Sequence, residues 1–283
     1  MKRSICVVAF LVLAAQLPLW GYDSSPSIIK VIPEAIWALA TGGGTWVTEL
    51  QITCCGMGSS DISVWFEHKD GSQGPILLHS GLLWGDSLRY SNILETIDSL
   101  DPAAFNYYGL VGALYFQSGG GGGLIQVQAK TVNANYGKTF PGLSVVAGNT
   151  AAIVRKMMLQ DLVRNATYRT AIGAYNPVAG VTYSVTFMII GPFDNLIGSA
   201  FSKTLGPYGF ISFNPFAEAA VPPGNYENCW LHIEVTSGAS ASFDDGVVCF
   251  GSIANNYSND TYALIAKQYS SGVPGAPSAP IRH

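Results

Sequence analysis

Short runs in which hydrophobic and polar residues alternate recur along this chain. Residues 230–235 alternate strictly, which places Leu231, Ile233 and Val235 on one face, and residues 124–130 follow the same pattern. A period of two is that of a β-strand with one buried face. Gly, Asn, Asp and Ser separate these runs, so the pattern predicts short strands joined by turns.

Two segments favour helix over strand. Residues 150–163 are rich in Ala, Arg, Lys, Met, Leu and Gln, which are good helix formers. The sequence contains an internal repeat, and these residues take the place of the first strand of its second copy. We therefore expect a strand there. A short helical turn is expected over residues 92–100.

The sequence resembles itself at an offset of 122 residues. Residues 45–50 align with residues 167–172, and Asn92 aligns with Asn214. Weaker matches at nearly the same offset continue to Tyr257. Each repeat is about the length of an immunoglobulin-like sandwich. The predicted fold class is therefore all-β, with two tandem Ig-like antiparallel β-sandwich modules.

The predicted modules span residues 27–142 and 143–268. A Phe-Pro-Gly turn sequence at residues 140–142 marks the boundary. Residues 269–283 contain three prolines and little that could be buried, so we expect a disordered tail.

The N-terminus has the pattern of a secretory signal peptide. Lys2 and Arg3 precede an apolar run over residues 5–17, and the small residue Gly21 follows. We expect residues 1–21 to be a signal peptide and the mature protein to be secreted, extracellular or on the cell surface. An uncleaved membrane anchor is the alternative. No membrane span is expected after cleavage, because no later segment is apolar over 18 residues.

Composition narrows the range of partners. Charged residues make up only 11% of the chain and aromatic residues 12%. Removing Lys2 and Arg3 from the 14 basic residues leaves 12, against 18 acidic residues, and the basic residues form no cluster. Nucleic-acid binding depends on neutralising phosphates and is not expected. A protein partner fits a low-charge, aromatic-rich surface.

Several short segments carry a resemblance to a known group. Residues 31–33 (Val-Ile-Pro), 42–48 and 131–140 resemble segments of bacterial secreted proteins with tandem Ig-like β-sandwich repeats, which mostly lack assigned functions. The first repeat departs from the group at Val47 and at Cys54 and Cys55. The resemblance implies a fold and a compartment, and it brings no catalytic residues.

Four cysteines remain after residue 21, and an even number in an exported chain indicates disulfides. Cys229 and Cys249 flank a predicted hairpin that turns near residue 239, so we expect them to face the core and form a disulfide. Two buried free thiols are the alternative. Adjacent Cys54 and Cys55 leave three states open, namely a vicinal disulfide, pairing with another chain and free thiols.

No pattern marks catalysis, a metal site or a cofactor site. The histidines are isolated and no GxSxG sequence is present. The glycines at residues 119–123 lack the Lys-Ser/Thr of a phosphate loop. The acidic turn at residues 244–246 lacks calcium-ligand spacing. We expect a protein that is not an enzyme, with no cofactor.

The sequence thus predicts a secreted, non-catalytic structural or interaction protein of the cell exterior. Its expected partner is protein, either a second copy meeting it through strand edges or another cell-surface protein. The alternative is a glycan- or ligand-binding β-sandwich module. Its candidate binding residues are Trp230, His232, Tyr107 and Tyr108, because aromatic side chains form platforms for sugars.

Overall fold

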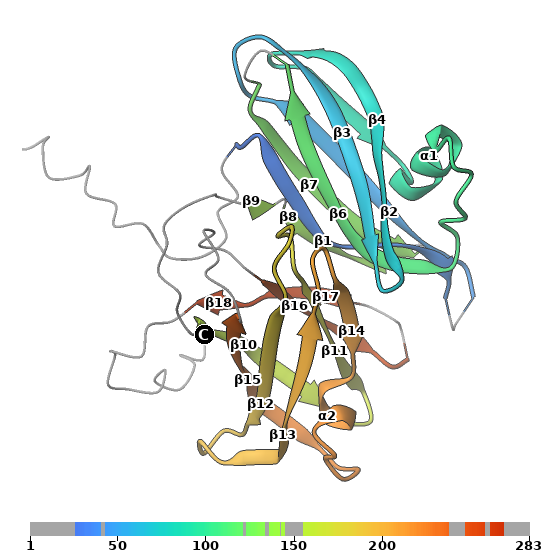
Figure 1. Cartoon of the computed structure of the whole chain (residues 1–283). Helices are drawn as coiled ribbons and strands as arrows, with labels where there is room; N and C mark the ends of the chain where they lie inside the picture. The colour runs from blue at the N-terminus through green and yellow to red at the C-terminus, as the bar shows by residue number, and fades with distance from the viewer. Residues whose placement is uncertain are drawn as a thin grey trace, which may run out of the picture.

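The computed structural model describes residues 26–40, 43–120, 123–133, 136–141, 143–144, 155–237, 247–257 and 261–268. These residues form an all-β protein with two short helices, arranged as two stacked halves (Figure 1). We call residues 26–144 the first half and residues 155–268 the second half. The predicted signal peptide, the predicted tail, the turn near residue 239 and the acidic turn at residues 244–246 lie outside the described residues.

The first half is a single nine-stranded sheet folded into two layers. Its strand order is β4-β3-β6-β1-β2-β7-β8, with β5 on β2 and β9 on β1. Strand β1 joins the layers because it pairs first with β6 and then, at its last two residues, with β2. The elements are β1 (Ile29–Leu39), β2 (Thr45–Cys54), β3 (Ser59–His68), β4 (Gly71–Leu83), β5 (Ser87–Tyr90), α1 (Ile93–Leu100), β6 (Leu110–Gly119), β7 (Ile125–Asn133), β8 (Tyr136–Pro141) and β9 (Leu143–Ser144).

The second half consists of two separate sheets. One has the order β13-β12-β15-β10-β18 and the other β14-β11-β16-β17. The elements are β10 (Arg155–Arg164), β11 (Tyr168–Tyr175), β12 (Tyr183–Ile190), β13 (Leu196–Leu205), β14 (Phe210–Phe213), α2 (Pro215–Glu218), β15 (Tyr226–Ser237), β16 (Val248–Asn255), β17 (Thr261–Ile265) and β18 (Lys267–Gln268).

The same pairing scheme occurs in both halves. Strand β3 pairs with β4 and β6, and its counterpart β12 pairs with β13 and β15. Likewise β2 pairs with β5 and β7, and β11 pairs with β14 and β16. Asn92 and Asn214, which the sequence offset aligns, are the N-cap residues of α1 and α2. The predicted module boundary at residues 142 and 143 is not tested by this arrangement and stays a prediction.

Each half encloses an apolar core between its layers. The first core draws on residues 32–129 and the second on residues 157–266. As the alternation predicts, Leu231, Ile233 and Val235 of β15 are buried in the second core. The alternation in β7 is equally regular, so a half-buried strand was identified correctly in each half.

Strand β10 confirms the expected strand over residues 155–163, in spite of its helix-forming composition, and residues 150–154 lie outside the described residues. Met157, Leu159 and Leu162 are all buried in the second core, and the pairing with β15 shifts register after Leu159. Asp161, with φ of 64°, takes up the shift. Packing against a neighbouring strand therefore overrides intrinsic propensity here. The helix expected over residues 92–100 is confirmed as α1.

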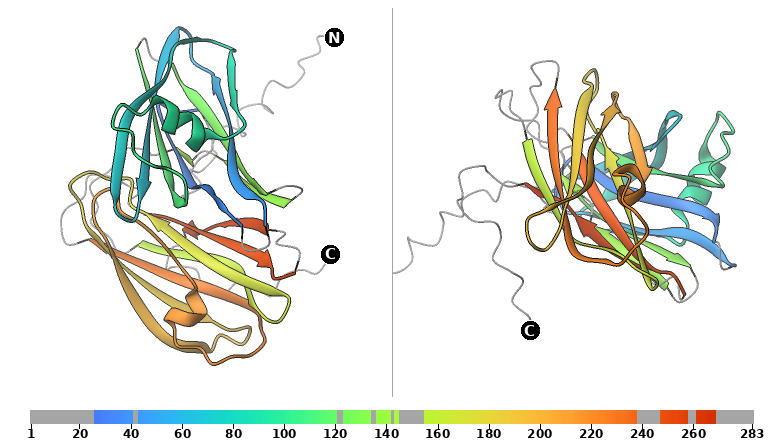
Figure 2. Two further views of the ribbon diagram at one scale, coloured as in Figure 1. Left: turned by 90° about the vertical axis from the view of Figure 1, so that its right-hand side faces the viewer. Right: turned by 90° about the horizontal axis from the view of Figure 1, so that it is seen from below.

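The two halves meet across the outer faces of one layer from each (Figures 1 and 2). Strands β1 and β6 of the first half lie against β11, β14 and β16 of the second, and β8 lies against β17. In the part of the chain that the structure describes, neither helix has the length and apolar character needed to cross a bilayer.

Candidate functional site between the two halves

A third apolar cluster seals the contact between the halves. Phe250 of β16 belongs to this cluster, and its ring packs directly over Gly173 on the neighbouring strand β11. A Cβ atom at residue 173 would lie 1.9 Å from Cζ of that ring, so only glycine leaves the space. The buried members of the cluster are Val31, Ala113, Tyr175, Phe210, Val248 and Phe250.

A buried ion pair reinforces the same contact. The Lys138 ammonium lies 2.5 Å from Oε1 of Glu34 and donates a hydrogen bond to Oγ of Ser252. Glu34 and Lys138 belong to β1 and β8 of the first half, whereas Ser252 belongs to β16 of the second. Both charged side chains are about nine-tenths buried. A pair with this little exposure is screened far less by solvent than a surface pair.

A protonatable carboxyl group lies near this contact. Glu67 of β3 is 1% exposed, and its Oε1 atom accepts a hydrogen bond of 2.9 Å from Oγ of Ser72. Its Oε2 atom is buried and has no hydrogen-bond partner among the described residues. Burial raises the pKa of Glu67 to about 7, although the Ser72 hydrogen bond acts in the opposite direction.

Tyrosines surround this carboxyl group. Burial, followed by the influence of Tyr208 and Glu67, raises the pKa of Tyr115 to about 12. Burial and the charge of Glu67 also hold the pKa of Tyr175 well above its usual range. The Tyr175 hydroxyl is likewise buried without a partner among the residues described. The contact between the halves therefore holds a carboxyl group and phenols that favour their neutral forms.

The raised pKa of Glu67 predicts a specific pH dependence of stability. The folded protein binds this proton more tightly than the unfolded chain, so the free energy of unfolding should fall as pH rises from about 4.5 to 7. The fall should reach at most about 3 kcal/mol and end above pH 7. Urea unfolding at a series of pH values should show this slope for the natural protein and a flatter one for Glu67→Gln. Equal slopes in the two proteins would contradict the assignment.

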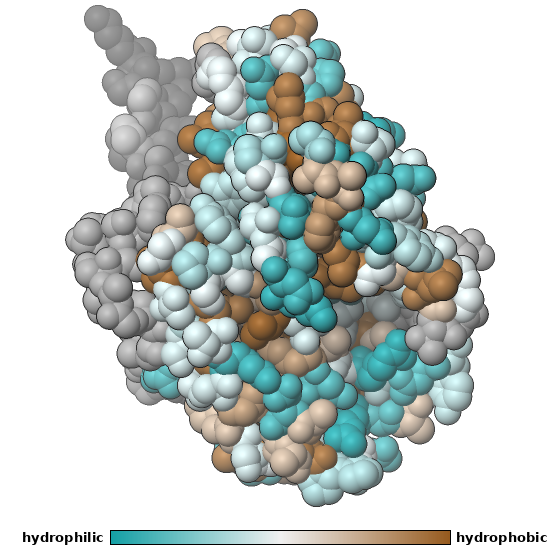
Figure 3. Space-filling view, turned by 45° about the vertical axis from the view of Figure 1, so that its right-hand side comes forward, coloured by the Kyte–Doolittle hydropathy of each residue, from teal (hydrophilic) through white to brown (hydrophobic). Residues whose placement is uncertain are grey.

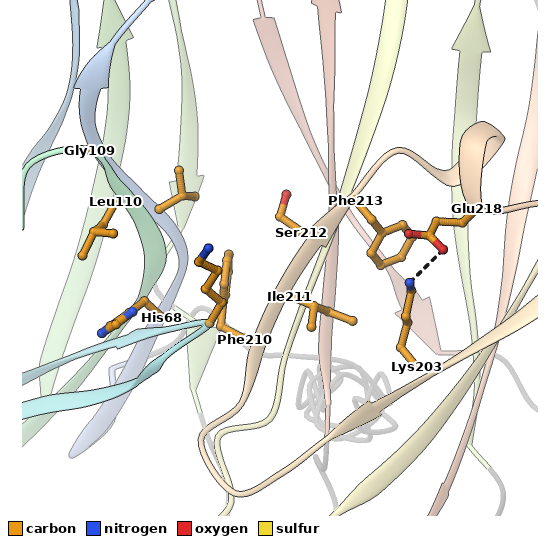
Figure 4. A pocket seen from close by; sticks show the side chains of 11 residues that line it. His68, Gly109, Leu110, Lys203, Phe210, Ile211, Ser212, Phe213 and Glu218 are labelled. Carbon is orange, nitrogen blue, oxygen red and sulfur yellow. Dashed lines mark ion pairs between the residues drawn. The ribbon is translucent and has the colours of Figure 1, made fainter.

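A cavity of about 470 Å³ opens beside the contact (Figure 4). The first half contributes the turn after β3 and the start of β6, and the second half contributes β13, β14 and α2. The lining residues are His68, Lys69, Gly109, Leu110, Val111, Lys203, Phe210, Ile211, Ser212, Phe213 and Glu218. We call this the inter-half cavity.

Helix α2 places a carboxylate in the wall of this cavity. The Asn214 side chain caps the helix by accepting hydrogen bonds from the backbone N–H groups of Phe216 and Ala217. Glu218 at the helix end then pairs with Lys203 of β13, with 2.7 Å between Oε2 and Nζ. The same ammonium lies 5.7 Å from the ring centroid of Phe213. Lys203 is therefore held in one place by a charge and by an aromatic face.

His68 packs against aromatic side chains and is not placed to transfer protons in the cavity. Its ring stacks on Phe66 and tilts against Phe105 inside the first half, and in Figure 4 it points away from Lys203. Its Nδ1 atom accepts a hydrogen bond from the backbone N–H of Asp70. Burial lowers the pKa of His68, and this outweighs the opposing effect of the Asp70 carboxylate. The imidazole is therefore neutral at neutral pH.

The inter-half cavity thus combines apolar side chains with a fixed ammonium and carboxylate. Such a lining suits binding and orientation of a molecule. Over the described ranges of the chain, no three His, Cys, Asp or Glu side chains come together in a way that could hold a metal ion.

The aromatic residues singled out from the sequence lie elsewhere. Trp230 and His232 lie on the outer face of β15, with ring centroids 6.2 Å apart. Trp230 is half-buried but His232 is buried, which leaves a smaller platform than the alternation predicted. Burial lowers the pKa of His232, and nearby Glu234 opposes this.

The assignment of Tyr107 to a binding surface is wrong. Tyr107 is fully buried in the first core, and its hydroxyl donates a 2.7 Å hydrogen bond to Oδ2 of Asp101. The segment after α1 folds back over the core and carries this ring against Phe66. Its neighbour Tyr108 is exposed and lies edge-on to Trp37. The four candidate residues therefore do not converge on one site.

The predicted disulfide between Cys229 and Cys249 is not present, and all four described cysteines are free thiols. The hairpin on which it depended is wrong, because β15 and β16 belong to opposite sheets. Both side chains do face the second core, as predicted, and burial raises the pKa of Cys229 to about 11. Cys54 is buried at the end of β2, and Cys55 beside it is half-buried.

Sequence reasoning did not identify the residues that join the halves. The charges of Glu34 and Lys138 within strand-like runs were the available signal, and nothing in the sequence links them to each other or to Ser252. No model of a known protein family matches this chain, and a search of curated proteins gave no match either. The resemblance to secreted proteins with tandem Ig-like repeats therefore stays a prediction.

Proposed function

We propose that this chain is a secreted, non-catalytic structural or interaction protein of the cell exterior, built from two tandem β-sandwich modules. It acts through contacts of its surface, and its partner is a second copy of itself. The signal-peptide pattern of the N-terminus supports export. The observation that carries the interaction role is an apolar surface on the first half.

This surface is the end of the first half that points away from the second half (Figures 1 and 3). Met57, Leu83 and Trp84 are 86%, 57% and 68% exposed there, and Leu124 is also exposed. Backbone hydrogen bonds hold their loops together, from Cys55 N–H to the Leu124 carbonyl and from Gly85 N–H to the Cys54 carbonyl. We call these four side chains the apolar end.

Large apolar side chains clustered in exposed loops usually mark an interaction site. The loops of the apolar end are tied to one another, so binding would lose little conformational entropy in ordering them. The buried contact between the halves does not cover the apolar end, because that contact involves the opposite region of the first half. Pairing of apolar ends between copies would hide these side chains from water.

Self-association is tested by sedimentation velocity over a range of protein concentrations. We expect concentration-dependent oligomers for the natural protein and a single-chain species for the Met57→Ser/Trp84→Ser double variant. The matched control is Leu77→Ser, because Leu77 is 56% exposed but lies in the middle of β4. A natural protein that stays monomeric, or a control that dissociates equally, would refute the proposal.

Glycan binding through Trp230, His232, Tyr107 and Tyr108 has less support. Tyr107 and His232 are buried, and the two tyrosines lie in a different half from Trp230. A glycan-binding screen with Trp230→Ala as control would establish this alternative if binding occurred and depended on Trp230.

A further inference from the structure

The inter-half cavity has the dimensions of a small-molecule site. Its volume of about 470 Å³ falls within the range of about 300–1,000 Å³ for such sites. Its walls come from both halves, and the apolar cluster and the Lys138 contact hold those halves together. The cavity is therefore formed before any ligand arrives, and binding would not have to assemble it.

One side of the lining is apolar. Leu110 and Val111 of the first half contribute to it, together with Phe210, Ile211 and Phe213 of the second. Among the described strands β14 lies at the edge of its sheet, and all four of its residues line the cavity, so the edge of this sheet borders the same space. A ligand with an apolar body would remove this lining from water and could hydrogen-bond to the strand edge.

The charged part of the lining favours an anion. Lys203 is paired with Glu218, whereas no described acidic side chain forms an ion pair with exposed Lys69. The nearby Asp70 carboxylate lies against His68 instead, 3.9 Å from its Nδ1 atom. With His68 neutral, the lining carries a net positive charge at neutral pH.

From this combination we propose that the inter-half cavity binds a small amphipathic organic anion, with a ring-containing apolar body and one anionic group. The apolar body lies against Leu110, Ile211 and Phe213. The anionic group lies toward Lys69, and the strand edge of β14 offers hydrogen bonds along the cavity. Lys203, held by Glu218 at the other end of the cavity, adds to the positive potential of the lining. This ligand site is independent of the apolar end.

The probe for this site is anilinonaphthalene sulfonate, an aromatic anion that fluoresces when its surroundings are apolar. Its uncharged counterpart is phenylnaphthylamine. We expect saturable binding of the sulfonate at one site per chain. Lys69→Gln should weaken sulfonate binding by about tenfold and Lys203→Gln should weaken it by less, and both should change phenylnaphthylamine binding little. Glu218→Gln should tighten sulfonate binding, because it removes the competing carboxylate.

The matched control is Lys130→Gln, an exposed lysine on β7 outside the cavity. Each variant is first shown to unfold at the same urea concentration as the natural protein. Binding that Lys69→Gln and Lys203→Gln leave unchanged would overturn the proposal, as would equal weakening by Lys130→Gln. Loss of sulfonate binding in Met57→Ser/Trp84→Ser would also overturn it, since the dye would then be reporting the apolar end.

Discussion

Replacing Phe187 with alanine is expected to lower the free energy of unfolding by about 3–5 kcal/mol. Phe187 is fully buried in β12, where its ring stacks on Phe201 at 5.3 Å and meets Phe213 edge-on at 5.0 Å. Its removal would leave a void that the strands on either side of β12 cannot close by collapsing. Equilibrium unfolding in urea measures the loss.

The control for this substitution is Phe193→Ala. Phe193 is 89% exposed in the turn after β12, and its replacement should change stability by no more than about 0.5 kcal/mol. Similar losses for the two alanine variants would show that packing of the buried Phe187 ring contributes no more to the free energy of unfolding than an exposed ring does. Because Phe213 also lines the inter-half cavity, Phe187→Ala should in addition weaken binding of anilinonaphthalene sulfonate.

The second large effect is expected for Lys138→Met, with a loss of about 3–5 kcal/mol. This change removes the ammonium that contacts both Glu34 and Ser252, and it leaves the Glu34 carboxylate buried without the lysine's charge. The cost arises chiefly from that uncompensated charge. Urea unfolding at pH 7 would measure this loss.

A double-mutant cycle separates the ion pair from other effects of the substitution. Glu34→Gln/Lys138→Met removes both charges together, so it should recover a large part of the stability that Lys138→Met loses. If the double variant were as unstable as the sum of the two single variants, the interaction between Glu34 and Lys138 would contribute nothing. The ion pair would then have to be dismissed as a source of stability.

Alternation predicted individual strands well, because it reports which side of a strand meets the core. The offset that aligns Asn92 with Asn214 also revealed a true correspondence, because both residues stand at the N-cap of a helix, although only the Asn214 side chain accepts capping hydrogen bonds. Even β10 was identified against its own propensity, because the repeat supplied information that local composition lacks.

Alternation could not show which strands become neighbours. Strands β15 and β16 have the pattern of a hairpin, but they belong to different sheets, so Cys229 and Cys249 lie in opposite layers. The inter-half cavity could not be predicted from the sequence for the same reason. Its lining comes from loops and strand ends of both repeats, and no periodicity relates Lys69 to Lys203.

The path of β1 has a mechanical consequence. Strand β1 pairs with β6 in one layer and then with β2 in the other, so backbone hydrogen bonds link the two layers of the first half. Sliding one layer over the other requires breaking these hydrogen bonds. In the second half, the chain from Thr261 to Gln268 makes the corresponding link, because β17 pairs with β16 in one sheet and β18 pairs with β10 in the other. A shearing load would therefore have to break backbone hydrogen bonds in either half before the two layers of that half could slide past each other.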